Sequence, residues 1–555
     1  MLDSYWEDKK SFMKKKFCVV FLMFLVSKIF GQQEHAWIYF KDKPSSTTYL
    51  SNPLTMLTQR ALDRRTNQSI VLDIKDVPLE ASYVSSIANS SGITVKARSK
   101  WLNALHVQGT KTNIDLLVNL SMVDSIDYAD KTLNKSKVSK KIKKNDKFGS
   151  IELNNSLDYG SAENQIDMLH GDYLHDLGFT GTGIQIAVLD AGFKGVETFA
   201  AFSNLLDTNN SNGEILGGYD FVNRNTNFYL DTGSTHGLSV LSTMGGYLMN
   251  QYIGTAPNAQ YYLFVTEDPP NESPLEESLW VEAAERADSL GVDIINTSLG
   301  YTTFDNSSYD YSYADMNGKT AFITRGAELA ASKGILLVNS AGNSGNDSWH
   351  YIGAPADASS VLSVGAVASN EAIASFSSFG PTSDNRVKPE VLAQGQLVYV
   401  INSAGNVVTS NGTSFSSPIM AGMSACLWQA FPDKTAQEIK NLIVQSSDIY
   451  TNPTDQRGYG VPDFQSIYEV LSVKKHALEA VTIYPTIVEN SFKIHFNKNG
   501  GPVSGSLINI SGVTVLEIDN DSANNKVDIS NLPSGIYFVE LKNKYKKTVL
   551  KLIKK

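Results

Sequence analysis

The chain carries a short apolar run, IQIAVLD, at residues 184–190. A run of this length, preceded by glycine, predicts a strand buried on both faces of a parallel sheet. Its last residue, Asp190, is followed by the turn-forming pair Ala191-Gly192. Ligands of open α/β sheets bind at the carboxyl ends of strands, so Asp190 is a candidate site residue. Taken alone, the same residue is explained equally well as a turn former or a helix cap.

Outward from this strand, apolar strand-like runs alternate with helix-like runs over residues 158–472. This alternation is typical of a parallel sheet whose strands are joined by crossover helices. We therefore predict an α/β domain with a mostly parallel central sheet. The predicted strands are 184–189, 261–265, 293–299, 334–340 and 361–367, and the predicted helices are 276–290, 321–333 and 414–431.

Three more polar residues stand at strand ends or helix starts in this block. His236, one of eight histidines, begins a run of small and apolar residues that predicts a tightly packed helix. Asn343 follows the strand 334–340 among glycines, where a turn residue is the simpler interpretation. Ser414 opens a predicted helix and is, by itself, most simply explained as its N-cap.

Together, these residues supply a complete set of groups for nucleophilic acyl transfer. A serine nucleophile needs a base within hydrogen-bond reach, a carboxylate that fixes the tautomer of that base, and donors for the oxyanion. Asp190, His236, Asn343 and Ser414 provide these groups in this order along the chain. The Gly-x-Ser-x-Gly elbow and the Ser-Asp-His order of α/β-hydrolases are absent from the sequence.

On these motifs, the block 158–472 resembles the subtilisin-like serine proteases. The matching segments are AVLDAG at 187–192, SAGNSG at 340–345, FGP at 379–381, KPE at 388–390, and GTSFSSP at 412–418 with Ala421-Gly422. In one departure, Leu238 stands where the family usually has the Thr of a His-Gly-Thr motif. The resemblance implies a subtilisin-like three-layer fold and an endopeptidase that hydrolyses peptide bonds through an acyl-enzyme.

The resemblance also implies a role for each of the four residues. Ser414 would be the nucleophile and His236 the base, Asp190 would orient the base, and Asn343 would stabilise the oxyanion. Proteins and peptides are the implied substrates, and no cofactor is implied for catalysis. Family members often bind structural Ca²⁺, but no Asp-x-Asp-x-Asp-Gly loop locates a calcium site in this sequence.

Substrate-binding residues follow from the same resemblance. Ser298, Leu299 and Gly300 would form an edge that pairs with the extended substrate, and Ala341 and Gly342 would form one wall of the P1 pocket. The tyrosine-rich insert 301–315 follows that edge. We expect it to cover the cleft, the alternative being an ordinary surface loop.

Residues 1–32 have the pattern of a signal peptide. A positive segment, KKK at 14–16, precedes an apolar segment at 17–30 and a small residue at Gly31. Met13 is a candidate for the true start, and a short membrane anchor is the alternative interpretation. We predict export through the periplasm to the outer cell surface or the medium.

Residues 33–130 form a block of short strand-like runs, at 37–40 and 105–107, with a helix-like run at 51–65. Through Arg64-Arg65 and SKWLNA at 99–104, the block resembles propeptides of subtilisin-like proteases from Bacteroidetes-type bacteria. The resemblance implies an inactive precursor whose propeptide acts as folding chaperone and inhibitor. Cleavage in the basic linker 131–157 would remove it, whereas a permanent accessory domain is the alternative.

Residues 473–555 change character again, with short alternating strands and turn signals that predict a small β-sandwich. The block resembles the sorting domain of type IX secretion substrates. The residues that carry this resemblance are IYP at 483–485, Gly512, VDISNL at 527–532, GIY at 535–537 and the lysine-rich end from 546 to 555. The type IX secretion machinery is the implied partner, and a carbohydrate- or protein-binding β-domain is the alternative.

Composition restricts the remaining possibilities. A net charge of −10 and a pI of about 5.4 argue against nucleic acid as a partner, because a duplex binder needs a concentrated basic face. Two alternatives to a general protease stay open. One is a non-catalytic surface binding protein with the same fold, and the other is a narrow processing enzyme that matures other exported proteins.

Overall fold

The computed structural model describes residues 32–134, 157–207, 213–479, 481–496, 504–519, 526–542 and 547–555. Nearly all of the predicted signal peptide and most of the basic linker therefore lie outside the described residues. The chain separates into two compact units, Met1–Gln465 and Ser466–Lys555. Below, residues 32–134 are called the N-terminal domain, 157–463 the central domain and 481–555 the C-terminal domain.

The central domain is built on a seven-stranded sheet of order β13-β12-β11-β10-β5-β9-β6, in which every neighbouring pair is parallel. The strands are β5 (Gln185–Asp190), β6 (Glu214–Asp220), β9 (Gln260–Val265), β10 (Ile294–Thr297), β11 (Leu336–Ser340), β12 (Leu362–Val367) and β13 (Val391–Gln394). The predicted α/β architecture is confirmed. The two edge strands, β6 and β13, were missed: β6 contains two glycines and is only half-buried, and β13 presents an apolar run of just three residues, Val391 to Ala393.

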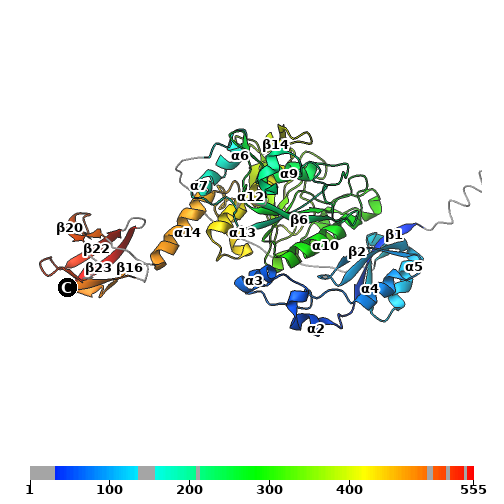
Figure 1. Cartoon of the computed structure of the whole chain (residues 1–555), viewed down its shortest axis with the longest axis horizontal. Helices are drawn as coiled ribbons and strands as arrows, with labels where there is room; N and C mark the ends of the chain where they lie inside the picture. Colours follow the sequence, from blue (N-terminus) through cyan, green and yellow to red (C-terminus); the bar gives the residue numbers. More distant parts are fainter. Residues whose placement is uncertain are drawn as a thin grey trace, which may run out of the picture. The chain divides into compact units, whose positions relative to one another are not determined.

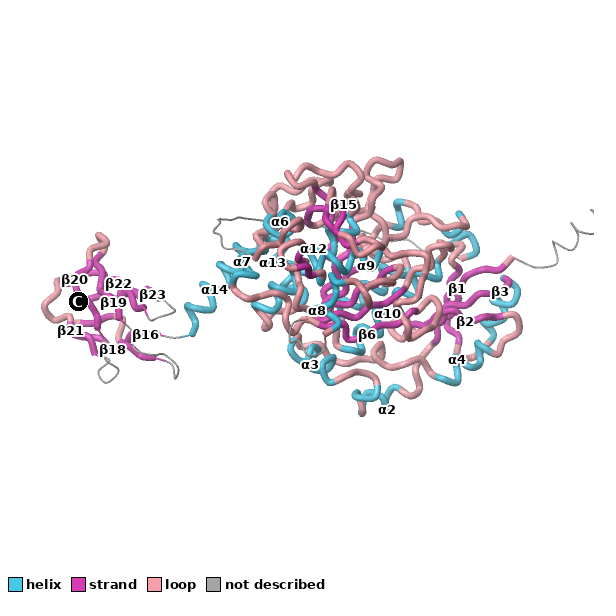
Figure 2. The backbone as a smooth tube through the Cα atoms, turned by 45° about the horizontal axis from the view of Figure 1, so that its top comes forward, coloured by secondary structure: helices cyan, strands magenta, loops and turns pink. Residues whose placement is uncertain are grey.

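Helices cover both faces of this sheet. One face carries α9 (His236–Gly245) and α12 (Thr413–Ala430), and the other carries α10 (Pro274–Leu290) and α11 (Phe322–Ser332). Those labelled α9, α10 and α12 can be followed in Figures 1 and 2. Side chains of β10 alternate between the two faces: Asn296 accepts a hydrogen bond from Ser417 of α12, and Thr297 accepts one from Trp280 of α10. The result is three layers, as the sequence predicts.

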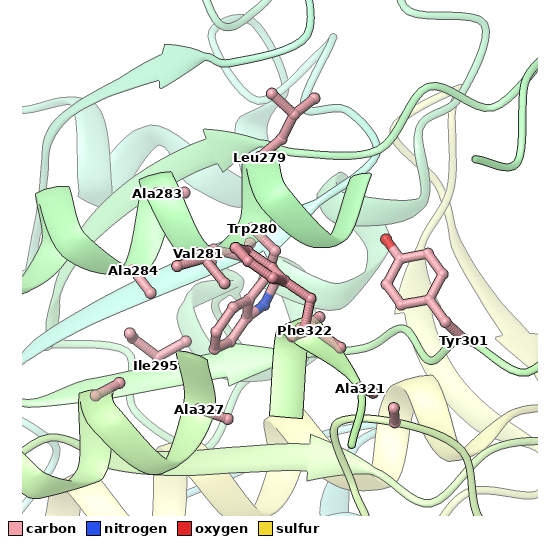
Figure 3. Close-up of a cluster of buried hydrophobic side chains, with 14 of the residues drawn as sticks. Leu279, Trp280, Val281, Ala283, Ala284, Ile295, Tyr301, Ala321, Phe322 and Ala327 are labelled. Atoms are coloured by element: carbon pink, nitrogen blue, oxygen red, sulfur yellow. The ribbon is translucent and has the colours of Figure 1, made fainter. Parts of the chain in front are cut away.

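The layer between α10, α11 and the sheet is filled by a few large side chains among many alanines (Figure 3). Trp280 is fully buried and lies with Ile295 and Phe322 in this cluster. Gly326 lets the two helices approach each other closely, because a Cβ there would lie 2.4 Å from a methyl carbon of Val281. Burial of a large apolar side chain stabilises the fold by about 1.5–3 kcal/mol, so this layer fixes the strand ends that carry the site.

Smaller elements complete the central domain. They are α6 (Glu163–Asp167), α7 (Gly171–Asp176), α8 (Ser203–Leu206), β7 (Tyr247–Leu248), β8 (Tyr252–Ile253), β14 (Val398–Ile401), β15 (Val407–Ser410) and α13 (Ala436–Gln445). None of the helices in the described part of the chain is long and apolar enough to cross a membrane.

The N-terminal domain has a four-stranded antiparallel sheet of order β2-β3-β1-β4. Its elements are β1 (Gln33–Phe40), α2 (Ser46–Ser51), α3 (Gln59–Asn67), α4 (Ala81–Ala88), β2 (Ile93–Ser99), β3 (Ala104–Thr110), α5 (Lys111–Leu116) and β4 (Val123–Tyr128). The predicted helix at 51–65 is wrong in its bounds. Pro53 starts a separate short turn, and the Thr58 side chain caps the amide of Ala61, so α3 begins only after Thr58.

The N-terminal domain packs against α10 of the central domain. The carboxylate of Glu285 accepts hydrogen bonds from the backbone amides of Lys100 and Trp101, at 2.9 Å each, and from the Ser99 hydroxyl at 2.6 Å. These residues form the turn between β2 and β3. One buried carboxylate on α10 therefore holds the tip of this hairpin.

The C-terminal domain contains a three-stranded sheet, β16-β18-β21, and a five-stranded sheet, β17-β23-β22-β19-β20. The strands are β16 (Val481–Tyr484), β17 (Ile487–Val488), β18 (Ser491–Phe496), β19 (Ser504–Asn509), β20 (Thr514–Asp519), β21 (Lys526–Asp528), β22 (Gly535–Lys542) and β23 (Lys547–Lys554). Phe492, Leu507 and Val539 belong to one shared core, which makes the pair of sheets a small β-sandwich. Helix α14 (Phe464–Glu479) precedes it and runs through the predicted boundary at 472/473.

Candidate active site

Asp190 and His236 meet at the carboxyl end of the central sheet. Asp190 is the last residue of β5, and His236 is the first residue of α9. His236 Nδ1 lies 2.7 Å from Asp190 Oδ1, while the Asp190 side chain is only 3% exposed and that of His236 is 35% exposed. The charge of Asp190 raises the pKa of His236 and outweighs the opposing effect of burial. A proton on Nδ1 that bonds Asp190 leaves Nε2 as the basic nitrogen.

A glycine permits this close approach of α9 to β5. A Cβ atom at Gly237 would lie 2.7 Å from the Phe193 ring, 2.8 Å from the Gly192 carbonyl oxygen and 3.0 Å from Asp190 Cβ. The Gly192 carbonyl also accepts a hydrogen bond from the Leu238 amide. Leu238, which replaces the family's usual Thr, is fully buried. The helix that carries His236 is thus fixed by backbone and apolar contacts.

Ser414 lies in the first turn of α12, beside the histidine. The ring of the next residue, Phe415, has its centroid 6.0 Å from that of His236. Ser414 Oγ donates a hydrogen bond to the Ser298 carbonyl at 3.4 Å, and Ser298 Oγ donates one to the Ser414 carbonyl at 2.8 Å. Among the described residues, no hydrogen bond joins Ser414 to His236. The structure brings the two residues to neighbouring turns with the hydroxyl aimed at Ser298.

The side chain of Asn343 is held at its oxygen. Its Oδ1 accepts hydrogen bonds from the Thr413 amide at 2.9 Å and from the Thr413 hydroxyl at 3.0 Å. These contacts direct Nδ2 away from Thr413. An ideal Cβ built on Gly412 lies 3.6 Å from both Asn343 Nδ2 and the Ser414 backbone nitrogen. The Asn343 side-chain amide and the Ser414 backbone amide therefore lie close to the same position beside Gly412.

One pocket of about 160 Å³ collects the remaining predicted residues. Its lining contains Ser414 and Asn343 together with all five predicted substrate-binding residues: Ser298, Leu299, Gly300, Ala341 and Gly342. Gly342 adopts φ +106°, a left-handed conformation that favours glycine, and a Cβ there would lie 2.9 Å from Ser378 Oγ. Ser414, Asn343 and the predicted substrate-binding residues thus share one pocket, whose lining does not include Asp190 or His236.

Other lining residues were missed by the sequence analysis. They are Thr302, Ser340, Ser344, Trp349, Tyr351, Gly353, Ser378 and Thr413. Ser340, Ser344 and Thr413 had a usable signal, because they stand inside the two motifs that contain Asn343 and Ser414. Ser378 lies in a loop that is distant from these motifs in sequence, and no local sequence pattern identifies it.

Glu267 is a further carboxylate near the site that the sequence analysis missed. It follows β9, which pairs with β5, and its Oε2 accepts a 2.6 Å hydrogen bond from the Tyr301 hydroxyl. It interacts electrostatically with Asp190 and contributes to the raised pKa of His236. Burial raises the pKa of Glu267 itself to about 8. An acidic residue just after the neighbouring strand was the signal that could have identified it.

No metal centre is present in the described ranges, where no three His, Cys, Asp or Glu side chains are arranged to hold an ion. Cys426 is a free, fully buried thiol whose Sγ lies 3.2 Å from the Thr255 carbonyl oxygen. Burial raises its pKa well above the ordinary value, which keeps the thiol protonated and unreactive.

Comparison with known proteins identifies three family models along the chain. The subtilase family model matches residues 181–462, and the model of the peptidase S8 propeptide domain of Bacteroidota matches residues 35–146. A secretion system C-terminal sorting domain matches residues 482–555. The three resemblances noted in the sequence are confirmed.

Curated relatives and a solved structure agree with these matches. Subtilisin DY of Bacillus licheniformis is 30% identical over 298 residues, which cover 53% of this chain and 93% of that protein. Subtilisin E of Bacillus subtilis is 30% identical over 318 residues, covering 57% and 72% of the two chains. The epidermin leader peptide processing serine protease of Staphylococcus aureus superposes with a TM-score of 0.52 at 15% identity, over 80% of this chain and 99% of that one.

The fold, the serine peptidase relatives and the family match agree on the class of enzyme. The subtilisin-like three-layer fold predicted from the sequence is confirmed, and peptide-bond hydrolysis in this family needs no cofactor. The chain belongs to the subtilase family of serine peptidases, with an S8 propeptide domain before the peptidase domain and a secretion sorting domain after it.

Proposed function

We propose that the chain is a secreted serine endopeptidase, made as an inactive precursor, whose triad is Asp190, His236 and Ser414. One observation carries the proposal. The 2.7 Å Asp190–His236 pair lies beside the turn of α12 that bears Ser414, and Ser414 and Asn343 line one pocket. A turn of the Ser414 hydroxyl toward His236 would complete the arrangement that nucleophilic acyl transfer requires.

In the first half of the proposed reaction, the Ser414 hydroxyl turns from the Ser298 carbonyl toward His236. Its oxygen attacks the scissile carbonyl carbon while His236 Nε2 accepts the proton. Asp190 stabilises the imidazolium that forms, and Asn343 Nδ2 and the Ser414 amide donate to the oxyanion. The C–N bond then breaks, the leaving amine takes the proton from His236, and an acyl ester remains on Ser414.

The second half repeats these steps with water. His236 accepts a proton from the water, whose oxygen attacks the ester carbonyl in the same oxyanion space. The C–O bond to Ser414 breaks, the serine regains its proton from His236, and the carboxylic acid product leaves. The N-terminal position of Ser414 on α12 also favours the negative charge that develops nearby.

We assign the substrate to the pocket that Ser414 shares with the five predicted binding residues. Ser298, Leu299 and Gly300 would pair with the substrate backbone, and Ala341 and Gly342 would line the P1 position. None of the residues that line this pocket carries a charge, and Trp349 and Tyr351 contribute aromatic surface. These walls favour an uncharged P1 side chain.

We assign residues 33–130 as the propeptide, 131–157 as the linker that is cleaved, 158–472 as the peptidase domain and 473–555 as the sorting domain. The propeptide would fold with the peptidase, inhibit it and then be removed. Its docking on buried acidic residues of α10 supports this assignment. The sorting domain would direct the exported chain to the type IX machinery and the cell surface or medium.

Self-processing tests the proposal. Purified full-length chain is incubated, and the products are followed by intact-mass spectrometry. We expect the wild type to lose its N-terminal domain through a cut within 131–157 and the Ser414→Ala variant to stay intact. If the purified variant were processed as fast as the wild type, Ser414 would not be the nucleophile. A permanently full-length, inactive wild type would instead support a binding protein.

A further inference from the structure

A lysine of the N-terminal domain is bound by the tyrosine-rich insert of the central domain. Lys131 Nζ donates a hydrogen bond to Asp315 Oδ2 at 2.9 Å and lies 4.0 Å from the centroid of the Tyr311 ring. A carboxylate beside an aromatic face is a favourable environment for an ammonium group. The insert thus holds a cation of the N-terminal domain.

The hydrogen bonds that position Tyr311 and Asp315 come from the central domain, while Tyr309 of the same insert donates one to Glu34 of the N-terminal domain. The Tyr311 hydroxyl lies 2.9 Å from both carboxylate oxygens of Glu277, and its amide donates to the Thr302 carbonyl at 2.8 Å. Asp315 accepts hydrogen bonds from the amide and hydroxyl of Ser312, both at 2.8 Å. Removal of the N-terminal domain therefore leaves these contacts in place.

The charges at this site suit a cation. The hydrogen bond from Lys131 and those from Ser312 lower the pKa of Asp315 despite its partial burial. Glu277, which is fully buried next to Tyr311, adds a second carboxyl group. Burial raises the pKa of Glu277, and its interaction with Lys131 opposes that rise. Lys131 also interacts with Asp127 of its own domain, which would leave with it.

The site adjoins the pocket of Ser414. Thr302 lines that pocket, and its carbonyl oxygen accepts the amide proton of Tyr311. The insert also continues directly from the proposed substrate edge, which ends at Gly300. An extended substrate that lay along this edge and continued past Gly300 would pass Thr302, whose carbonyl oxygen is bonded to Tyr311.

We propose that Tyr311 and Asp315 form an accessory binding site for one lysine or arginine side chain of the protein substrate, and that Lys131 occupies it in the precursor. The inference rests on the proposed function, because the site opens only when the N-terminal domain is removed. It assigns to the mature enzyme a preference for a basic residue several positions before the scissile bond.

The test uses mature enzyme from self-processing and peptides with one fixed scissile bond. Each peptide carries a single lysine at one position from the fourth to the eighth residue before that bond, or the uncharged norleucine instead. We expect lysine at one position to raise kcat/KM by about 3- to 30-fold over norleucine. Asp315→Asn should remove this preference, whereas Tyr311→Phe, which keeps the ring, should retain it.

The matched control is Asp305→Asn, because Asp305 is an exposed carboxylate of the same insert that makes no contact with Lys131 among the described interactions. It should keep the lysine preference. Enzyme that reacts with a fluorophosphonate probe but cleaves lysine and norleucine peptides equally at every position overturns this inference alone. Wild-type enzyme that neither reacts with the probe nor cleaves any peptide overturns the proposed function and, with it, this inference.

Discussion

At the scale of single residues, two polar side chains of the site are each held at one end by a neighbouring residue. Asp190 holds His236 at Nδ1, and Thr413 holds Asn343 at its oxygen. The sequence predicts the four residues of the proposed site because each stands in a recognisable motif. It missed Thr413 and Glu267 as supporting groups, because their roles depend on contacts with strands and loops that are distant in sequence.

The fixed orientation of Asn343 leads to a kinetic prediction. Asn343→Ala should lower kcat by about 10²–10³-fold with little change in KM, because the lost hydrogen bond forms mainly in the transition state. Steady-state kinetics on one peptide substrate measure this effect. Asn370→Ala, at an exposed turn after β12, is the control and should match the wild type. A raised KM with unchanged kcat would assign Asn343 to substrate binding instead.

The Asp190–His236 pair predicts a change in pH dependence. The negative charge of Asp190 stabilises the imidazolium and raises the pKa of His236, so activity should fall as pH drops through that raised value. Asp190→Asn removes the charge, lowers the pKa of His236 and should move the acidic limb of kcat/KM to lower pH. It should also reduce kcat by about 10⁴-fold. An acidic limb that stays at the same pH would show that His236 does not control it.

At the scale of helices and strands, the long apolar runs were predicted well because their burial and length are local properties. The five predicted strands and the helices α10, α11 and α12 agree with the structure to within a few residues. The run at 51–65 was not predicted well, because Pro53 and the Thr58 cap divide it. The functional use of α3 depends on tertiary contacts and has no local signal.

Helix α3 joins the N-terminal domain to α10 through buried charges. Arg65 lies 2.8 Å from Asp288 and 3.0 Å from Asp76, and all three side chains are at most 2% exposed. Arg64 binds the same Asp288 at 2.5 Å. Removal of one partner from such a cluster leaves buried charges uncompensated, which typically costs about 3–5 kcal/mol.

We therefore expect Arg65→Met, made in the unprocessed Ser414→Ala chain, to lower the free energy of opening at this interface by about 3–5 kcal/mol. Hydrogen exchange of the β1 and β3 amides measures this opening. Lys111→Met is the control, since Lys111 forms an exposed pair with Asp115 and should change the value by less than about 1 kcal/mol. Equal exchange in the two variants would show that the α3 cluster does not hold the domain in place.

At the scale of the whole molecule, the chain combines three domains. The N- and C-terminal domains have cores of their own, and the core of the central domain also includes Trp37, Ala97, Trp101 and Ala129 of the N-terminal domain. Their order and classes could be predicted from sequence, because each block has its own composition and motifs. The docking of the N-terminal domain could not be predicted from the sequence. It depends on contacts between acidic residues of α10 and the backbone amides and arginines of the N-terminal domain.

The separate core of the C-terminal domain predicts that catalysis does not need it. A chain that ends at Glu479 should process itself and cleave peptides with the same kcat/KM as the full chain, within about twofold. In the source cell, however, the truncated enzyme should fail to reach the cell surface or medium. Fractionation followed by immunoblotting measures this distribution. Normal export of the truncated chain would show that residues 473–555 are not needed for sorting.

The most direct test of the account is covalent labelling of Ser414. Mature wild-type enzyme is treated with a fluorophosphonate probe, and the labelled peptide is identified by mass spectrometry alongside the Ser414→Ala variant. We predict a single labelled site at Ser414 in the wild type and none in the variant, because only a serine activated by His236 reacts with the probe. Labelling that persists in the variant, or that never appears in mature wild type, would contradict the assignment of Ser414 as the nucleophile.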